Sequence, residues 1–148
     1  MSANALRLEY SVEAEVSLAF AWAFRTNVAT WNDPPATFTL EGPFVTGAWG
    51  STQMPGQEPL RWQIGDVRPG ESFTLQMPLD GATLTFQWSF EALSAERTKM
   101  TQTILLSGDN ASAYASQVEA GFGPTLADGM KRIAAEMSSA ERAGQQAT

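Results

Sequence analysis

The sequence predicts an α+β fold in which one seven-stranded antiparallel sheet packs against a long C-terminal helix. Three observations carry this prediction: strict alternation of apolar and polar residues from Leu6 to Val16, a second region of two-residue period from Ala36 to Leu106, and a helical period beyond Asn110. An apolar sheet face and an apolar helix face bury each other most simply by packing together.

The first strand is expected to lead into a connector of two short helices. Residues 6–16 place apolar side chains on one face and three glutamates on the other, which indicates a half-buried strand with a solvated acidic face. Ser17 is a favourable N-cap for an apolar helix that reaches Arg25, and Thr26 is expected to cap a second short turn. The run Asn32-Asp33-Pro34-Pro35 then ends the connector.

Six further strands are expected between Ala36 and Leu106. Gly and Pro interrupt the two-residue period at short intervals, so consecutive strands should pair as an antiparallel meander. The expected turns are Gly42-Pro43, Pro55-Gly56, Arg68-Pro69-Gly70, Asp80-Gly81 and Ser94 to Arg97.

A long helix is expected to close the domain. Apolar residues recur every three or four positions from Tyr114 to Met137 and would lie on one helical face. Gly121, Gly123 and Pro124 predict a kink in the middle of this helix, because proline removes one backbone hydrogen bond. We therefore expect residues 1–137 to form a single domain and residues 138–148 to form a polar, frayed tail.

Composition excludes several classes of function. The chain has 148 residues, a net charge of −7, no His and no Cys. The acidic balance disfavours nucleic acid and anionic membranes as partners. Thiol catalysis, disulfides, Ser-His-Asp triads and His/Cys metal sites cannot be built, and the acidic residues are dispersed, so we expect no metal and no cofactor. With no signal peptide or membrane span in the sequence, we expect a cytoplasmic protein, and a homodimer is left open.

Four segments resemble a known superfamily. They are Val16-Ser17-Leu18-Ala19-Phe20-Ala21-Trp22, Trp31-Asn32-Asp33-Pro34, Gly42-Pro43-Phe44-Val45-Thr46-Gly47 and Val67-Arg68-Pro69-Gly70-Glu71. With the order of elements, residues 6 to 137 resemble the polyketide cyclase/dehydrase-like branch of the START-like, helix-grip superfamily (SRPBCC). The resemblance implies a curved sheet that grips the C-terminal helix around a hydrophobic cavity. Members include lipid, sterol and hormone carriers, aromatic polyketide cyclases, ring-hydroxylating dioxygenase subunits and chaperone activators, so the fold does not select a function.

Inward-facing aromatic and thioether side chains are the candidate ligand-binding residues. We expect a cavity of several hundred Å³ between the long helix and the sheet, the usual size of a small-molecule pocket. Its expected lining is Trp62, Phe73, Met77, Phe86, Trp88 and Phe122. Tyr114 lies on the inner helix face and could cap the cavity with its hydroxyl. The alternative for each of these residues is ordinary core packing.

Gln102 is the one clearly polar residue in the inward row of the last strand, and it is expected either to hold the polar end of a ligand or to be a satisfied core amide. The inward rows around Trp88 and Gln102 are both even-numbered, so a four-residue loop from Ser94 to Arg97 would turn one row outward. The hairpin therefore has a loop of three or five residues, or a bulge. Three residues would set Gln102 opposite Trp88, and five would set it opposite Phe90.

Three classes of function remain open. The leading hypothesis is a module that binds a hydrophobic, aromatic or lipid-like molecule in the sheet–helix cavity. The second is a cyclase or dehydratase, for which only Tyr114, Asp66 and Arg61 are candidates, so the catalytic residues stay unknown. Asp66 shares the parity of Trp62 and Ile64 and could face inward, but we expect it to be solvated at the end of its strand, because burial of an unpaired carboxylate is costly. The third is a protein-interaction domain, which an exposed apolar patch would indicate. Arg61, Arg25 and Arg68 lie near loops that could frame the cavity opening, but single arginines on an acidic surface are expected to be solvated.

Overall fold

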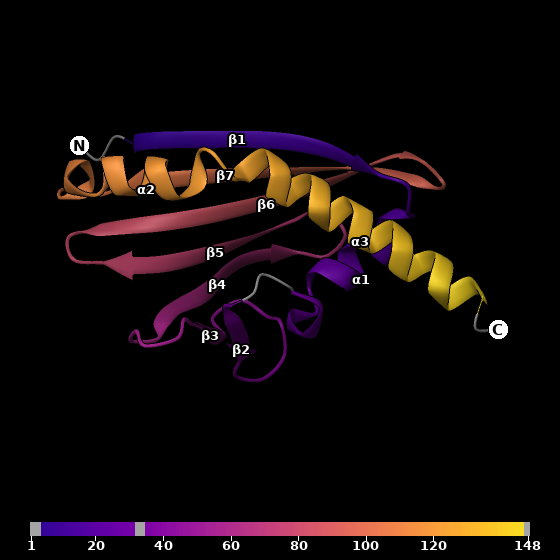
Figure 1. The fold of residues 1–148 in the computed structure, drawn as a ribbon, viewed down its shortest axis with the longest axis horizontal. Coiled ribbons are helices and arrows are strands. Elements are labelled where there is room, and N and C mark those ends of the chain that lie inside the picture. The colour runs from indigo at the N-terminus through magenta and orange to yellow at the C-terminus, as the bar shows by residue number, and fades with distance from the viewer. Residues whose placement is uncertain (1–3, 32–34, 147–148) are drawn as a thin grey trace.

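The computed structural model describes residues 4–31 and 35–146. The elements in chain order are β1 (Asn4–Ala14), α1 (Leu18–Arg25), the 3₁₀ helix η1 (Val28–Thr30), β2 (Thr37–Leu40), β3 (Trp49–Gln53), β4 (Leu60–Arg68), β5 (Ser72–Leu79), β6 (Ala82–Ser94), β7 (Arg97–Ser107), the 3₁₀ helix η2 (Ala111–Ala113), α2 (Ala115–Phe122) and α3 (Leu126–Gln146). The described strands form one antiparallel sheet in the order β1-β7-β6-β5-β4-β3-β2 (Figure 1). The predicted α+β fold, with seven strands and two short helices after the first, is confirmed.

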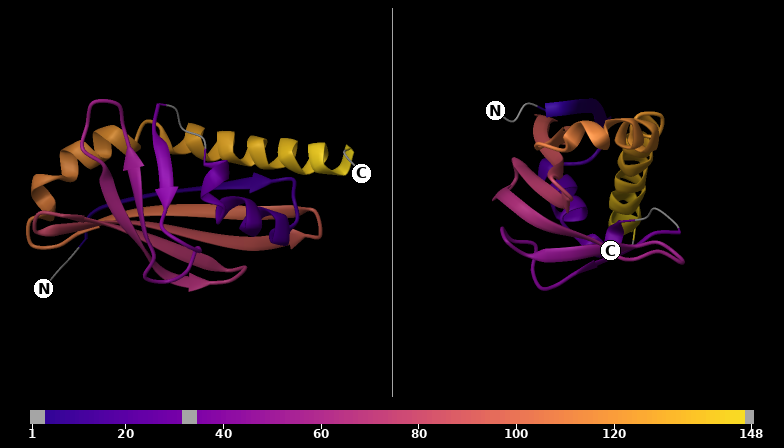
Figure 2. Two further views of the ribbon diagram at one scale, coloured as in Figure 1. Left: turned by 90° about the horizontal axis from the view of Figure 1, so that it is seen from below. Right: turned by 90° about the vertical axis from the view of Figure 1, so that its left-hand side faces the viewer.

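The helices lie on one side of a curved sheet. Figure 2 shows α2 and α3 crossing the concave face, with α1 between the C-terminal part of α3 and the sheet. Contacts agree with this view, because α3 packs on β1 while α1 touches β6, β7 and α3. Helix α1 of the connector therefore fills the space between the C-terminal half of α3 and the centre of the sheet.

Local side-chain bonds explain where the connector helices begin. The Ser17 hydroxyl accepts a hydrogen bond from the backbone N–H of Phe20 at 3.1 Å, as expected for the N-cap of α1. Asn27, not Thr26, caps η1: its Oδ1 accepts from the N–H of Ala29, whereas the Thr26 hydroxyl donates back to the carbonyl of Trp22. Of the run expected to end the connector, residues 32–34 lie outside the described residues.

The β6–β7 hairpin contains the predicted irregularity. Ser94 pairs with Arg97, the register shifts between Ala92 and Ser94, and Trp88 then stands opposite Gln102. The bulge keeps both even-numbered rows on the concave face. Because Tyr10 pairs with Gln102 on the other side, Gln102 lies in the middle of a row across three strands.

The C-terminal helical region differs from the single kinked helix that we predicted. It begins with η2 and breaks into α2 and α3 between Phe122 and Leu126, where Gly123 and Pro124 stand. It also extends further, because residues 138–146, expected to form a frayed tail, continue α3. The tail is rich in Ala, Glu, Arg and Gln, which favour helix, and polarity alone is a poor indicator of a helix end. Residues 147–148 lie outside the described residues.

Gly50 of β3 lies at a point where the backbone closely approaches a buried side chain. A Cβ atom at this position would overlap the Trp62 ring, which is buried and donates from Nε1 to the Thr52 hydroxyl at 3.0 Å. Gly50→Ala is therefore expected to lower the free energy of unfolding by about 1–2 kcal/mol through overpacking, as urea denaturation would measure. Gly121→Ala is the matched control: its Cβ meets open space on α2, and it should be neutral or slightly stabilising. Equal effects of the two changes would contradict this packing.

Candidate functional site

Phe73 is the centre of a dense aromatic cluster on the concave face. Its ring lies 5.9 Å from that of Trp22, 5.0 Å from Phe44, 6.2 Å from Trp88 and 6.1 Å from Phe90. Phe73, Trp88 and Trp62 are 0%, 1% and 3% exposed. These three residues, expected to line a cavity, form packed core in this structure, because side chains from α1 and the β2–β3 loop reach inward and contact them. Their part in ligand binding stays a prediction.

The other predicted lining residues lie toward the opposite end of the sheet. The ring centres of Phe86 and Phe122 lie 5.4 Å apart in an edge-to-face arrangement, and Met77 and Phe86 each pack against both core clusters. The Tyr114 hydroxyl donates to the carbonyl of Asp80 at 3.2 Å and ties the start of α2 to the β5–β6 turn. The structure therefore divides the eight candidate residues between two ends of the interior.

The burial of Arg25 is the feature that sequence reasoning missed. We expected this arginine to be solvated, but its guanidinium carbon lies 4.2 Å from the centre of the Trp88 ring and 4.7 Å from that of Trp31. Its Nε is buried and has no hydrogen-bond partner. Burial lowers the pKa of Arg25 from its ordinary value to about 9, partly opposed by the negative charge of Glu136 on α3. A cation has thus been brought into an aromatic interior.

Local structure fixes this position. Arg25 is the last residue of α1, and Trp31 folds back over it because the Trp31 Nε1–H donates to the carbonyl of Arg25 at 2.8 Å. The sequence signal was available: Arg25 is the only charged residue in a helix whose other seven residues are apolar. A terminal arginine is usually explained by the helix dipole, so this pattern alone did not indicate burial.

Gln102 lies next to this arginine site. It is half-buried and stands opposite Trp88, whose ring contacts Arg25. One row of paired residues crosses the sheet from β1, which lies under α3, to the aromatic cluster on β5. In order, its members are Tyr10, Gln102, Trp88 and Phe73. The polar residue that the sequence singled out and the arginine whose burial it missed therefore adjoin the same indole ring.

An open groove of about 440 Å³ lies between η1 and the edge strand β2. The residues that line it are Thr26, Asn27, Val28, Ala29, Phe38, Thr39, Leu40, Gly42 and Phe44. Phe38 and Leu40 belong to the concave face, because Leu40 pairs with Gly50 and Gly50 with Trp62. Phe38 contacts Trp31 at 5.4 Å and Phe44 contacts Phe73 at 5.0 Å. Two residues of the groove, Phe38 and Phe44, thus contact the aromatic interior directly from the β2 side.

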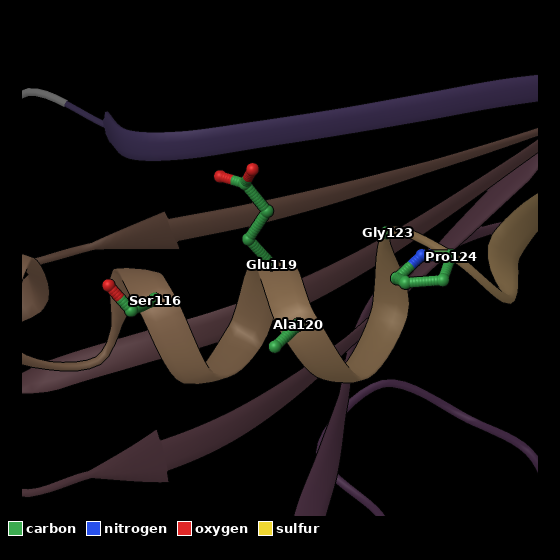
Figure 3. Close-up of a pocket in the computed structure, with 5 residues that line it drawn as sticks. All are labelled: Ser116, Glu119, Ala120, Gly123 and Pro124. Atoms are coloured by element: carbon green, nitrogen blue, oxygen red, sulfur yellow. The ribbon is translucent and has the colours of Figure 1, made fainter.

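A second hollow, of about 480 Å³, lies on α2, and Figure 3 shows its five labelled residues on that helix and the turn after it. These residues are Ser116, Glu119, Ala120, Gly123 and Pro124. All five are exposed, so this is a surface hollow on one helix. Neither hollow coincides with the cavity expected between the long helix and the sheet.

The three candidate catalytic residues do not converge. Asp66 shares the parity of Trp62 and Ile64, but a bulge between Ile64 and Val67 brings Val67 opposite Phe73 and leaves Asp66 in solvent, paired with Arg68 at 3.0 Å. Arg61 is also exposed and pairs with Glu41 at 2.6 Å. Tyr114, bonded to the β5–β6 turn, belongs to a third region.

Neither a broad apolar surface nor a membrane helix stands out in the described part of the chain. The exposed large apolar side chains there, Val45, Leu60 and Leu93, belong to three separate segments. Among residues 4–31 and 35–146, no helix combines the length and hydrophobicity that crossing a bilayer requires.

No family model matches the sequence, and no curated protein matches it. Solved structures do match the fold. A norcoclaurine synthase point mutant from Thalictrum flavum, in complex with a transition state analogue, has a TM-score of 0.72 at 10% identity, over 96% of this chain and 98% of that chain. The Zhui aromatase/cyclase from Streptomyces sp. R1128 has a TM-score of 0.67 at 16% identity, over 89% and 93% of the two chains. A protein from Arthrobacter aurescens has a TM-score of 0.66 at 21% identity, over 91% and 87%.

These likenesses, together with the curved sheet and its C-terminal helix, show that the chain has the helix-grip fold that these solved structures share. The fold implied by the sequence resemblance is therefore confirmed. At these identities the comparison shows the fold alone, and the function has to be argued from the site.

Proposed function

We propose that this protein is a cytoplasmic protein that binds a small hydrophobic, aromatic molecule. The ligand enters the space between the sheet and the helices from the groove between η1 and β2. The observation that carries the proposal is the groove itself. Its apolar part, formed by Val28, Phe38, Leu40 and Phe44, is joined to the buried rings by the Phe38–Trp31 and Phe44–Phe73 contacts. Its volume of about 440 Å³ falls in the usual range for small-molecule sites.

The chemistry of the groove suits such a ligand. Aromatic side chains bind flat rings by stacking and by edge-to-face contact, and Thr26 and Asn27 offer polar groups at the rim. A structural neighbour, the Thalictrum flavum norcoclaurine synthase, was crystallised with dopamine and hydroxybenzaldehyde, which are small aromatic molecules. That likeness supports the size and class of ligand. No reaction is proposed, because Tyr114, Asp66 and Arg61 are held apart by their own partners.

Ala29→Phe tests the groove as the binding site. Ala29 is exposed and lines the groove, so a phenyl group there should occupy ligand space without disturbing the core. The probe is N-phenyl-1-naphthylamine, a neutral aromatic compound whose fluorescence rises in apolar sites. We expect the wild-type protein to bind it, and Ala29→Phe to weaken binding by about tenfold, equivalent to about 1.4 kcal/mol.

Ala23→Phe is the matched control, because Ala23 is exposed on α1 but does not line the groove. It should bind the probe as the wild type does. Absence of binding to the wild-type protein would refute the proposed function, and equal affinity of all three proteins would show that the probe binds elsewhere.

A further inference from the structure

We propose that Arg25 is the anchor for a carboxylate on the ligand, so that the protein binds an aromatic acid. This inference rests on the proposed function and adds the chemical class of the ligand. It begins from an interior guanidinium that contacts two indole rings and has a buried Nε without a hydrogen-bond partner.

The first step concerns the missing partner. Within the described residues, no hydrogen bond or ion pair joins the Arg25 guanidinium to another side chain, although exposed Arg61 and Arg68 each have a carboxylate. Glu136 on α3 faces Arg25 closely enough to act on its charge, but its carboxylate is 3.5 Å from the Nε of Arg132. A buried cation normally has a counter-ion, so the site lacks a negative group.

The second step concerns geometry. The rings of Trp31 and Trp88 are not hydrogen-bond acceptors for the guanidinium in this structure, and within the described residues its N–H donors make no hydrogen bond to another side chain. Arginine offers these donors as a planar fork that matches the two oxygens of a carboxylate. Arg25 keeps part of its surface accessible even though Nε is buried, so a small acid can reach it after modest side-chain movement.

The third step concerns the rest of the ligand. Trp31, which covers Arg25, also touches Phe38 of the groove at 5.4 Å. A molecule with its carboxylate at Arg25 would therefore place its apolar body along Phe38 and the neighbouring groove residues. A purely apolar ligand would leave the cation unpaired, and a basic ligand would be repelled by it.

The test compares 2-naphthoate with 2-naphthamide by calorimetry at neutral pH, because the two compounds differ in charge and share their ring system. The wild-type protein should bind 2-naphthoate at least about tenfold more tightly. Arg25→Gln should remove this preference and leave the affinity for 2-naphthamide little changed. Arg61→Gln is the control, since Arg61 also lies over an indole ring, 4.9 Å from the centre of Trp49, but at the surface. It should keep the preference.

The outcomes separate the two proposals. If neither naphthalene compound nor N-phenyl-1-naphthylamine binds the wild-type protein, the proposed function is wrong. If the acid and the amide bind the wild type equally, or if Arg25→Gln retains the preference, the carboxylate anchor is wrong and the binding function stands. If Gln102→Leu removes the preference while Arg25→Gln does not, the anchor is Gln102, which also overturns the inference. The comparison of 2-naphthoate with 2-naphthamide in the wild-type protein tests the carboxylate anchor even if an Arg25 variant folds poorly.

Discussion

Phe73→Ala should lower the free energy of unfolding by about 3–5 kcal/mol, the range for truncating a fully buried phenylalanine. Phe73 is 0% exposed and its ring meets four other aromatic rings, from α1, the β2–β3 loop and β6. Large rings on several separate elements cannot all move to close the space left by one phenyl group, so a cavity should remain. Urea denaturation followed by intrinsic fluorescence would measure the loss, because Trp22 and Trp88 border the site.

Phe122→Ala provides the comparison for this change. Phe122 is half-buried on α2 and stacks edge to face on Phe86 alone among the described aromatic residues. Its truncation should cost less than half as much, since less apolar area leaves water on folding. If the two variants lose similar amounts of free energy of unfolding, the aromatic cluster around Phe73 is loosely packed. Such packing would match the open cavity that we expected from the sequence.

The fold was predictable because it depends on periodicity. The alternation in residues 6–16 and 36–106 and the helical spacing from Tyr114 fix which side chains face inward, and burial in the structure follows these rows. The register of Gln102 was limited in advance to a few alternatives, because its parity and that of Trp88 had to agree. The structure selects the one with a bulge and Trp88 opposite.

The candidate site was less predictable, because it depends on irregularities and on contacts between distant residues. Asp66 is solvated, as expected for an unpaired carboxylate, but no local sequence pattern predicts the bulge in β4 that places it in solvent. The aromatic side chains of α1 and the β2–β3 loop fill the expected cavity, because the connector lies between α3 and the sheet. Burial of Arg25 needs Trp88, on the sequence-distant strand β6, in addition to the nearby Trp31.

The energetic position of Arg25 leads to the second large effect. Removing a guanidinium from water costs several kcal/mol, and contact with two indole rings returns part of that cost. Arg25→Met keeps a long apolar stem against Trp31 and Trp88 and removes the charge. The backbone bond from Trp31 Nε1 to the carbonyl of residue 25 is retained. We therefore expect Arg25→Met to raise the free energy of unfolding by about 2–3 kcal/mol at neutral pH.

This gain should depend on pH in a defined direction. Burial lowers the pKa of Arg25 to about 9 in the folded protein, well below the ordinary value that it has in the unfolded chain. Below pH 9 both states carry the proton and the folded protein bears the full cost of the buried charge. Above pH 9, and up to the pKa of the unfolded chain, the unfolded state binds more protons, so the wild type becomes more stable relative to the Met variant as pH rises.

Urea denaturation of the wild type and of Arg25→Met, near neutral pH and about one unit above the folded-state pKa, would measure the difference between their free energies of unfolding. This difference should be smaller at the higher pH. Arg61→Met is the control, because Arg61 is exposed and its removal should change stability little at either pH. If Arg25→Met is destabilised, or if the difference in free energy of unfolding does not change with pH, burial of the Arg25 charge does not destabilise the folded protein. In that case the absence of a contacting carboxylate would no longer argue for an acidic ligand.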